Sequence, residues 1–320
     1  IYNQTGRNTY KGGLYNEGGG ERDVISLAFS RFFNDGDGSF TIGYTHQNID
    51  ELSGMASTTA NSSYGKYAAS DYNNRTAQRS IYETEHRLFA TMSSTHYFFG
   101  ADKPTTFNLF FERKSGLPGT YSWDTYTSRN YGGTAYQREA FGYEKNLNDD
   151  SSHLIYVPTG LTDPNVCWGS CNGAPDLAIA NQVLEMLHNT LGLKSYAGQI
   201  VPNGVYEYPW QTTLDLKITQ ILPGFRAEDE FVASLGIENS LNLIDSNKGV
   251  IEYGPYNGKM AVLDMYMNDD FSKYIYPNYK GRGYPDWAYG FNQSNPKGIR
   301  KSAVNSIWRA QLGFTYKFSF

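Results

Sequence analysis

The last thirteen residues, Trp308 to Phe320, constrain the fold more than any other stretch of the chain. In the segment WRAQLGFTYKFSF, apolar or aromatic side chains alternate with small or polar ones up to a terminal aromatic residue. Because successive side chains of a strand point to opposite faces, one face would be continuously apolar and the other polar. A tilted strand of about nine to eleven residues is long enough to cross a bilayer. The segment therefore predicts the closing strand of an outer-membrane β-barrel.

The composition of the 320-residue chain is compatible with such a barrel, although the mean hydropathy is −0.55. In a transmembrane barrel only every second strand residue meets lipid, and the extracellular loops are long and hydrophilic. The 27 Tyr and 18 Phe residues suit aromatic girdles at the two membrane interfaces. A soluble β-sandwich or lectin can also be rich in Tyr and Gly, so composition alone leaves that alternative open. The net charge of −5 argues against nucleic acid as a partner.

Six further segments show the alternation and flanking turn residues of strands. They cover residues 23–33, 39–48, 85–99, 105–114, 210–221 and 230–243. Together with the terminal segment they predict an all-β, antiparallel transmembrane β-barrel segment of seven strands.

The connections between these strands differ greatly in length. Residues 34–38, 100–104 and 222–229 form short turns, whereas 50–84, 115–209 and 244–304 form long loops. Outer-membrane barrels have short periplasmic turns and long extracellular loops. A soluble sandwich has no reason to segregate its connections in this way, so the loop pattern favours the barrel.

The strand count has a consequence for the chain ends. Single-chain bacterial barrels have an even number of strands, with both ends periplasmic. Seven strands and a periplasmic C-terminus would leave residues 1–22 at the end of an extracellular loop. Either one strand is missed, or the chain is the C-terminal part of a larger barrel. The start at Ile1, without Met or a signal peptide, suggests a processed or truncated product.

The long loops carry local patterns of their own. Residues 176–191 have apolar side chains at helical spacing after a capping Asp176, which predicts an amphipathic helix packed on its own loop. A partner-binding helix is the alternative. The eight tyrosines between Tyr253 and Tyr289 would extend the sheet above the membrane or form a ligand surface. Cys167 and Cys171 are candidates for a local disulfide.

Several segments, taken in order, resemble the C-terminal half of TonB-dependent outer-membrane transporters. The resemblance is to the Oar-like branch, which has a carboxypeptidase-regulatory-like N-terminal domain. The matching segments are FERKSGLPGTYSW (111–123), HLIYVPTGLTDPNV (153–166), YAGQIVPNGVYEYPW (196–210), TTLDLKITQILPGF (212–225), FVASLGIENSLNLID (231–245) and the terminal WRAQLGFTYKFSF. The resemblance implies a barrel of about 22 strands, with this chain supplying about the last seven in a Gram-negative outer membrane. The plug domain and the segment that contacts TonB would lie outside this chain.

The resemblance also implies partners and functional residues. The partners would be the rest of the barrel and its plug, the TonB–ExbB–ExbD complex acting through the plug, lipid or lipopolysaccharide, and the barrel-assembly machinery. That machinery would recognise Tyr316, Phe318 and Phe320. From the alternation itself, five charged residues are expected to face the lumen: Glu112, Asp215, Lys217, Glu238 and Arg309. They would contact the plug or a substrate, or be charges that a water-filled interior tolerates in pairs.

Other activities find little support in the sequence. It contains no GxSxG, HExxH, Walker or dinucleotide-binding motif, so we expect no enzyme and no cofactor. The five histidines, at 46, 86, 96, 153 and 188, form no metal pattern. Asp35 and Asp37 fit an ordinary turn better than a calcium loop, and surface Ca²⁺ at the acids 149–150, 245 or 269–270 is unsupported. Energy-coupled transport is the expected function. A non-transporting surface adhesin and a passive channel are the alternatives.

Overall fold

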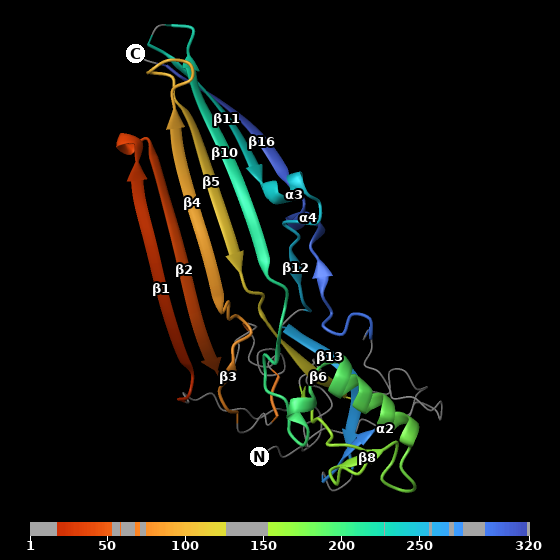
Figure 1. Cartoon of the computed structure of the whole chain (residues 1–320). Coiled ribbons are helices and arrows are strands. Elements are labelled where there is room, and N and C mark those ends of the chain that lie inside the picture. Colours follow the sequence, from red (N-terminus) through yellow and green to blue (C-terminus); the bar gives the residue numbers. More distant parts are fainter. Residues whose placement is uncertain are drawn as a thin grey trace.

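The computed structural model describes residues 18–52, 58, 68–70, 75–125, 153–226, 228–255, 258–268, 272–277 and 292–318. Figure 1 shows a broad sheet of long strands and, at one end of it, a group of shorter elements. We call the first the long-strand sheet. The second, made by the described residues of 115–209 and 255–277, we call the loop lobe.

The long-strand sheet is antiparallel throughout, and seven strands follow one another in the order β1-β2-β4-β5-β10-β11-β16. The strands are β1 (Glu21–Phe33), β2 (Gly38–Glu51), β4 (His86–His96), β5 (Thr105–Lys114), β10 (Gln211–Pro223), β11 (Glu230–Glu238) and β16 (Arg309–Lys317). The two-residue β3 (Gln78–Arg79) pairs with the end of β2. Each of the seven segments predicted from alternation forms one of these strands.

Two predicted strand ends are wrong. The third strand stops at His96 rather than Phe99, and the sixth stops at Glu238 rather than Leu243. After Glu238, Asn239 takes the left-handed conformation with φ 51°, and the short helix α3 (Ser240–Ile244) follows. The side-chain amide of Asn239 donates to the carbonyls of Gly249 and Ser306, each at 2.8 Å. These contacts turn the chain at a position where the alternation alone predicts continued strand.

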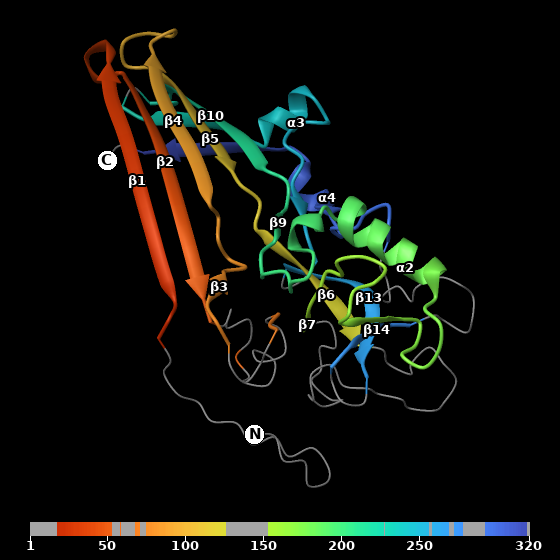
Figure 2. The same ribbon diagram turned by 60° about the horizontal axis from the view of Figure 1, so that its bottom comes forward.

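The two ends of the long-strand sheet differ as the loop lengths predict. Short connections join β1 to β2, β4 to β5 and β10 to β11, the first through a 3-10 helix at Asn34–Gly36. In Figures 1 and 2 these turns lie at the same end of the sheet as the end of β16, whereas the loop lobe lies at the other end. The described residues of all three long connections therefore start from the same end of the sheet.

The loop lobe contains a second sheet, which the sequence analysis did not predict. Its path is β7-β6-β13-β14-β8, with β9 also paired to β6. The bounds are β6 (Pro118–Thr125), β7 (His153–Leu154), β8 (Val166–Trp168), β9 (Tyr206–Glu207), β13 (Lys259–Met267) and β14 (Tyr274–Tyr276). The pairs β13–β6 and β14–β8 are parallel. The described chain is therefore mostly β, as predicted, and the loop lobe adds parallel pairs to the antiparallel long-strand sheet.

The expected helix begins where its cap predicts. The Asp176 carboxylate accepts hydrogen bonds from the backbone amides of Ala178 and Ile179, at 3.1 and 3.2 Å, and α2 (Leu177–Leu184) follows. Residues 185–190 continue it as a π-helical turn rather than as regular α-helix. Its apolar side packs inward, which agrees with packing on its own loop. No helix among the described residues has the length and apolar character needed to cross a membrane.

The main buried hydrophobic core lies in the loop lobe and is strongly aromatic. Trp123 and Tyr276 are fully buried, with ring centroids 5.1 Å apart, and Trp168 stacks on Tyr276 at 5.2 Å. Tyr274 stacks on Tyr156 at 4.7 Å. The two described tyrosines of β14 therefore extend a sheet, and Tyr276 is not part of a ligand surface. The tyrosines at 256, 279, 284 and 289 lie outside the described residues.

Asp163 organises the loop before β8. Its buried carboxylate accepts hydrogen bonds from the Thr159 and Asn165 amides, at 2.7 and 2.8 Å, and from the Tyr156 and Thr159 hydroxyls. Burial alone would raise the pKa of Asp163, but these hydrogen bonds outweigh it and hold the pKa below its ordinary value. The turn thus depends on an ionised carboxylate.

Two short elements complete the described chain between β11 and β16. The strand pair β12 (Glu252–Tyr253) and β15 (Arg300–Lys301) is antiparallel, and α4 (Ala303–Ser306) leads into β16. Among the described residues, β1 and β16 each pair along one edge only, so no closed barrel is formed by the part of the chain described. The long-strand sheet is therefore open at both sides.

Candidate functional site

The register of the long-strand sheet separates its side chains into two chemically different faces. Directly paired residues of antiparallel strands share a face, so each row can be followed across the sheet. One row, for example, runs from Phe107 through Ile218 and Leu235 to Leu312. We call the face that contains this row the apolar face.

The apolar face extends over all seven strands. It carries Ile25, Leu27, Phe29 and Phe33 of β1, Phe40, Ile42 and Tyr44 of β2, Leu88, Ala90 and Met92 of β4, Phe107, Leu109 and Phe111 of β5, Leu214, Leu216, Ile218 and Leu222 of β10, Phe231, Ala233, Leu235 and Ile237 of β11, and Ala310, Leu312, Phe314 and Tyr316 of β16. Each of these side chains is exposed or half-buried. Leu27 is 69% exposed on β1, and Leu312 is 68% exposed on β16. Over the described residues, no second layer covers this face.

The opposite face, which we call the polar face, has a different composition. It carries Ser26 and Ser30 of β1, Ser39, Thr41, Gly43 and Thr45 of β2, Arg87, Thr91 and Ser93 of β4, Thr106, Asn108 and Glu112 of β5, Asp215, Lys217 and Thr219 of β10, Ser234, Gly236 and Glu238 of β11, and Arg309, Gln311, Gly313 and Thr315 of β16. Val24, Ala28, Phe32, Phe89, Phe110, Ile221 and Val232 interrupt it, and Arg31, His46, His86 and Arg113 lie on the apolar face. The ring of Phe89 lies over Gly43, where a β-carbon would overlap it. A hollow of about 480 Å³ lies on this face, beside Asn108, Lys217 and Gly236.

All five charged residues expected to face a lumen lie on the polar face. Asp215, Lys217 and Glu238 line the hollow, and the Arg309 guanidinium is 3.7 Å from Glu238. Glu112 pairs with Arg87 at 2.7 Å and with Lys114 at 3.4 Å. Asp215 accepts a hydrogen bond from the Asn239 amide at 2.8 Å, which gives this carboxylate a structural role as well. Glu112 and Glu238 thus each have a positively charged neighbour.

The residues expected to form an assembly signal lie at the turn end of β16. The Tyr316 hydroxyl donates to Asp229 at 2.7 Å and accepts from the Phe225 amide at 2.9 Å. The ring of Phe318 is 4.8 Å from the ring of Tyr316 and is 66% exposed. Phe320 lies outside the described residues. An aromatic group therefore stands at the turn end of the sheet, on the apolar face.

The two cysteines and the histidines His153 and His188 lie in the loop lobe. Cys167 and Cys171 form a disulfide. The Nε2 atom of His188 is 2.8 Å from the Pro158 carbonyl oxygen. His153 is buried, and this burial lowers its pKa to about 4. The acids at 149–150 and 269–270 lie outside the described residues, and Asp245 caps a turn through the Asn247 amide.

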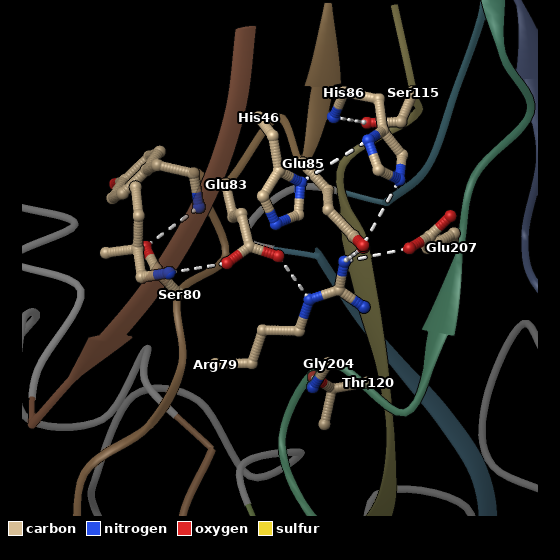
Figure 3. A network of polar contacts seen from close by, with 12 residues as sticks. His46, Arg79, Ser80, Glu83, Glu85, His86, Ser115, Thr120, Gly204 and Glu207 are labelled. Carbon is tan, nitrogen blue, oxygen red and sulfur yellow. Dashed lines mark hydrogen bonds and ion pairs between the residues drawn. The ribbon is translucent and has the colours of Figure 1, made fainter. Parts of the chain in front are cut away.

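A charged network joins the opposite end of the sheet to the loop lobe (Figure 3). The Arg79 guanidinium contacts three carboxylates: Glu83 at 2.5 Å, Glu85 at 2.8 Å and Glu207 at 2.8 Å. Glu83 is almost fully buried and also accepts a hydrogen bond from the Ile49 amide at 2.6 Å. Burial opposes ionisation of Glu207, but its contact with Arg79 leaves its pKa below the ordinary value. The network therefore ties β2, the segment before β4, and β9 together.

Two histidines meet beside this network, a proximity that the sequence analysis missed. His46 of β2 and His86 of β4 are direct cross-strand partners, and their Nδ1 atoms are 3.4 Å apart. The Tyr44 hydroxyl is 2.8 Å from His86 Nδ1, and the Trp210 ring stacks on the His86 ring. His86 Nε2 is 3.3 Å from Glu85. Both histidines fall at the loop ends of neighbouring predicted strands, which is the signal that could have placed them together.

Comparisons of the chain with protein-family models, with curated proteins and with solved structures gave no match. The functional assignment therefore depends on the geometry of the two faces and of the loop end.

Proposed function

We propose that the chain forms the C-terminal part of the wall of an outer-membrane transport barrel, of the TonB-dependent and Oar-like kind. The observation that carries the proposal is the two-faced long-strand sheet. An uncovered apolar face of seven strands suits lipid, and a polar face with a charged hollow suits a water-filled interior that holds a plug. Along β10, the eight intervals from Leu214 to Leu222 span about 26 Å at about 3.3 Å per residue. This length is sufficient for the apolar band of a barrel, about 25 Å tall.

The loop end supplies the surface that would capture a substrate. A groove of about 470 Å³ lies between the sheet and the loop lobe. The side chains of Tyr82, Leu117 and Tyr253 line it and are each between 44% and 54% exposed, and Glu252 and Arg300 also line it. Aromatic and apolar walls with a few charged groups are typical of ligand sites. Tyr82→Ala and Tyr253→Ala should weaken uptake of the substrate without lowering the amount of assembled protein.

Cysteine labelling tests the orientation of the two faces in a membrane. Phe314 and Thr315 are adjacent on β16 and point to opposite faces. In native membranes, Thr315→Cys should react with a water-soluble maleimide, whereas Phe314→Cys should react only after the membrane is dissolved and the protein unfolded. The oxidised pair Cys167–Cys171 provides no thiol background. Equal reactivity of the two variants in membranes would show that the apolar face does not meet lipid.

Conductance separates transport through a gated barrel from a passive channel. The full-length protein in a planar bilayer should stay closed, because a plug would fill the polar interior. Steady conductance would favour the passive channel instead. A coding sequence that lacks a plug and a TonB-contacting segment upstream would favour the surface adhesin.

A further inference from the structure

A cluster of metal-ligating side chains stands at the loop end of the long-strand sheet. His46, Glu85 and His86 each offer one ligand atom, and these atoms all lie within 4.8 Å of one another. All three side chains are half-buried, so the cluster is shielded but open to solvent on one side. We propose that His46, His86 and Glu85 bind a divalent transition-metal ion with nitrogen and oxygen preference, such as Zn²⁺.

The spacing of the two imidazoles fits such an ion. In tetrahedral zinc sites the zinc–nitrogen bonds are about 2.0–2.1 Å, which places two ligand nitrogens roughly 3.4 Å apart. The Nδ1 atoms of His46 and His86 are separated by 3.4 Å. The rings stack with an angle of 28° between their planes, Glu85 Oε1 lies 3.3 Å from the other nitrogen of His86, Nε2, and the Tyr44 hydroxyl lies 2.8 Å from Nδ1. Binding of one ion by all three side chains therefore requires both imidazole rings to turn about χ2, a broad torsion, and Tyr44 to move aside. Two histidines and one glutamate leave a fourth position for water, a donor set that zinc uses.

The backbone beneath the cluster is held firmly. The His86 amide donates to the Ser115 hydroxyl at 3.1 Å, and the His86 carbonyl accepts from the Ser115 amide at 2.9 Å. The Glu85 carbonyl accepts from the Gln47 amide at 2.9 Å. These bonds hold Glu85, just before β4, and His86, its first residue, against β2 and the residue after β5. The ligand positions therefore depend on paired strands, which hold a site more rigidly than a free loop.

Neighbouring residues orient the ligand side chains. The Arg79 guanidinium binds Glu85 Oε2 at 2.8 Å, so Oε1 turns toward His86. The Trp210 ring stacks on the His86 ring, with the two centroids 5.9 Å apart. Partners of this kind fix the direction of a metal ligand and raise its affinity. They supply the support that an isolated pair of surface histidines lacks.

The local charge favours a cation and not an anion. Glu83, Glu85 and Glu207 surround the single guanidinium of Arg79, so three carboxylates face one positive group and two negative charges are in excess. Nearby Arg113 lies over the Trp210 ring, at 5.4 Å. The two imidazoles select a transition metal over Ca²⁺ or Mg²⁺, which prefer oxygen ligands. A bound ion would link the end of β2 to the start of β4.

The test is isothermal titration calorimetry of Zn²⁺ into the full-length, metal-free protein in detergent micelles. We expect saturable binding of one ion per chain. His46→Phe and His86→Phe keep a ring in the stack but remove the ligand nitrogens, and Glu85→Gln keeps the shape of the side chain. Each should weaken binding at least about tenfold, the smallest loss usual when even a supporting partner is removed.

A matched control and a second readout make the outcome decisive. His96 lies on the same strand and the same face, at the opposite end, so His96→Phe should leave Zn²⁺ binding unchanged. The electron paramagnetic resonance spectrum of Cu²⁺ bound to the wild type should show coupling to two ligand nitrogens, and the spectrum of His46→Phe should show coupling to one. Circular dichroism of each metal-free variant checks that it is folded. Absence of saturable binding, or binding that the three ligand variants do not weaken, would overturn the proposal.

Discussion

Replacing Leu312 by arginine tests the assignment of the apolar face most directly. Leu312 pairs with Leu235, and Leu235 pairs with Ile218, which lies halfway between Leu214 and Leu222 on β10. Leu312 therefore stands near the middle of the apolar band. Its side chain is 68% exposed in the isolated chain. The environment that covers this exposed part determines the cost of the substitution.

The magnitude follows from that exposure. Complete burial of a leucine side chain contributes roughly 1.5–3 kcal/mol, so lipid that covers the open two-thirds would contribute about 1–2 kcal/mol. An arginine loses this term and adds a cost for placing charge in hydrocarbon. Measured substitutions on the lipid face near the bilayer centre total about 2–4 kcal/mol. If water covered Leu312, the same substitution would change the free energy of unfolding by less than about 0.5 kcal/mol.

The assay is equilibrium unfolding of the full-length protein by guanidinium chloride in phospholipid vesicles. Gln311→Arg is the control, because Gln311 is adjacent on β16 and lies on the polar face. Leu312→Arg should lower the free energy of unfolding by about 2–4 kcal/mol, and Gln311→Arg should change it by less than about 0.5 kcal/mol. Equal, small effects of both variants would refute the assignment of the apolar face to lipid.

Substitutions at three further residues test the loop end and the loop lobe, with thermal unfolding as the common readout. Arg79→Met should destabilise the loop end by about 3 kcal/mol, because it leaves the buried carboxylate of Glu83 without its guanidinium; Arg79→Lys should restore part of the loss. Because the pKa of Asp163 is lowered from its ordinary value of 3.8, its ionised carboxylate stabilises the fold at pH values above 3.8, and this stabilisation is lost as the pH falls below 3.8. The loss of stability in acid should therefore be smaller in Asp163→Asn. Asp176→Ala should cost about 1 kcal/mol by removing the cap of α2, and Asp176→Ser should cost less.

The long strands could be predicted from the sequence because their signal is local. Each strand alternates over nine or more residues, and the apolar set can occupy one face in only one register. The end of β11 is different. Asn239 turns the chain through bonds to Gly249 and Ser306, which are 10 and 67 residues away in sequence. A pattern within residues 230–243 contains no information about those partners.

The loop lobe and the histidine cluster escaped prediction for a related reason. The strands β8 and β14 have three residues each, too few for a period, and their pairing joins positions more than a hundred residues apart. His46 and His86 are 40 residues apart in sequence and meet only through the pairing of β2 with β4. The polar-face positions of Glu112 and Lys217, in contrast, follow from alternation alone. Residues whose placement depends on their own strand are predictable, and residues whose placement depends on pairing are not.

The long-strand sheet and the loop lobe are joined by a continuous strand register. Lys114 pairs with Gln211 in the sheet, and Pro118 pairs with Glu207 in the lobe. From the first pair to the second, both segments advance by four residues, and between the two pairs the Tyr208 amide donates to the Leu117 carbonyl at 3.1 Å. The chain from β5 to β6 and its return from β9 to β10 therefore keep the same antiparallel register across residues 115–117, which belong to neither sheet.

This continuity explains how two parts with different sources of stability can fold together. The long-strand sheet leaves the apolar face of seven strands uncovered among the described residues, and the main hydrophobic core does not include it. That core lies in the loop lobe, built around Trp123 and Tyr276. Closing the connection between β5 and β10 costs entropy that rises only slowly with length, by about 0.6 kcal/mol for each doubling. A lobe folded on its own core holds the two sides of the ladder together, and thereby fixes the register in which β5 and β10 place the apolar and polar faces.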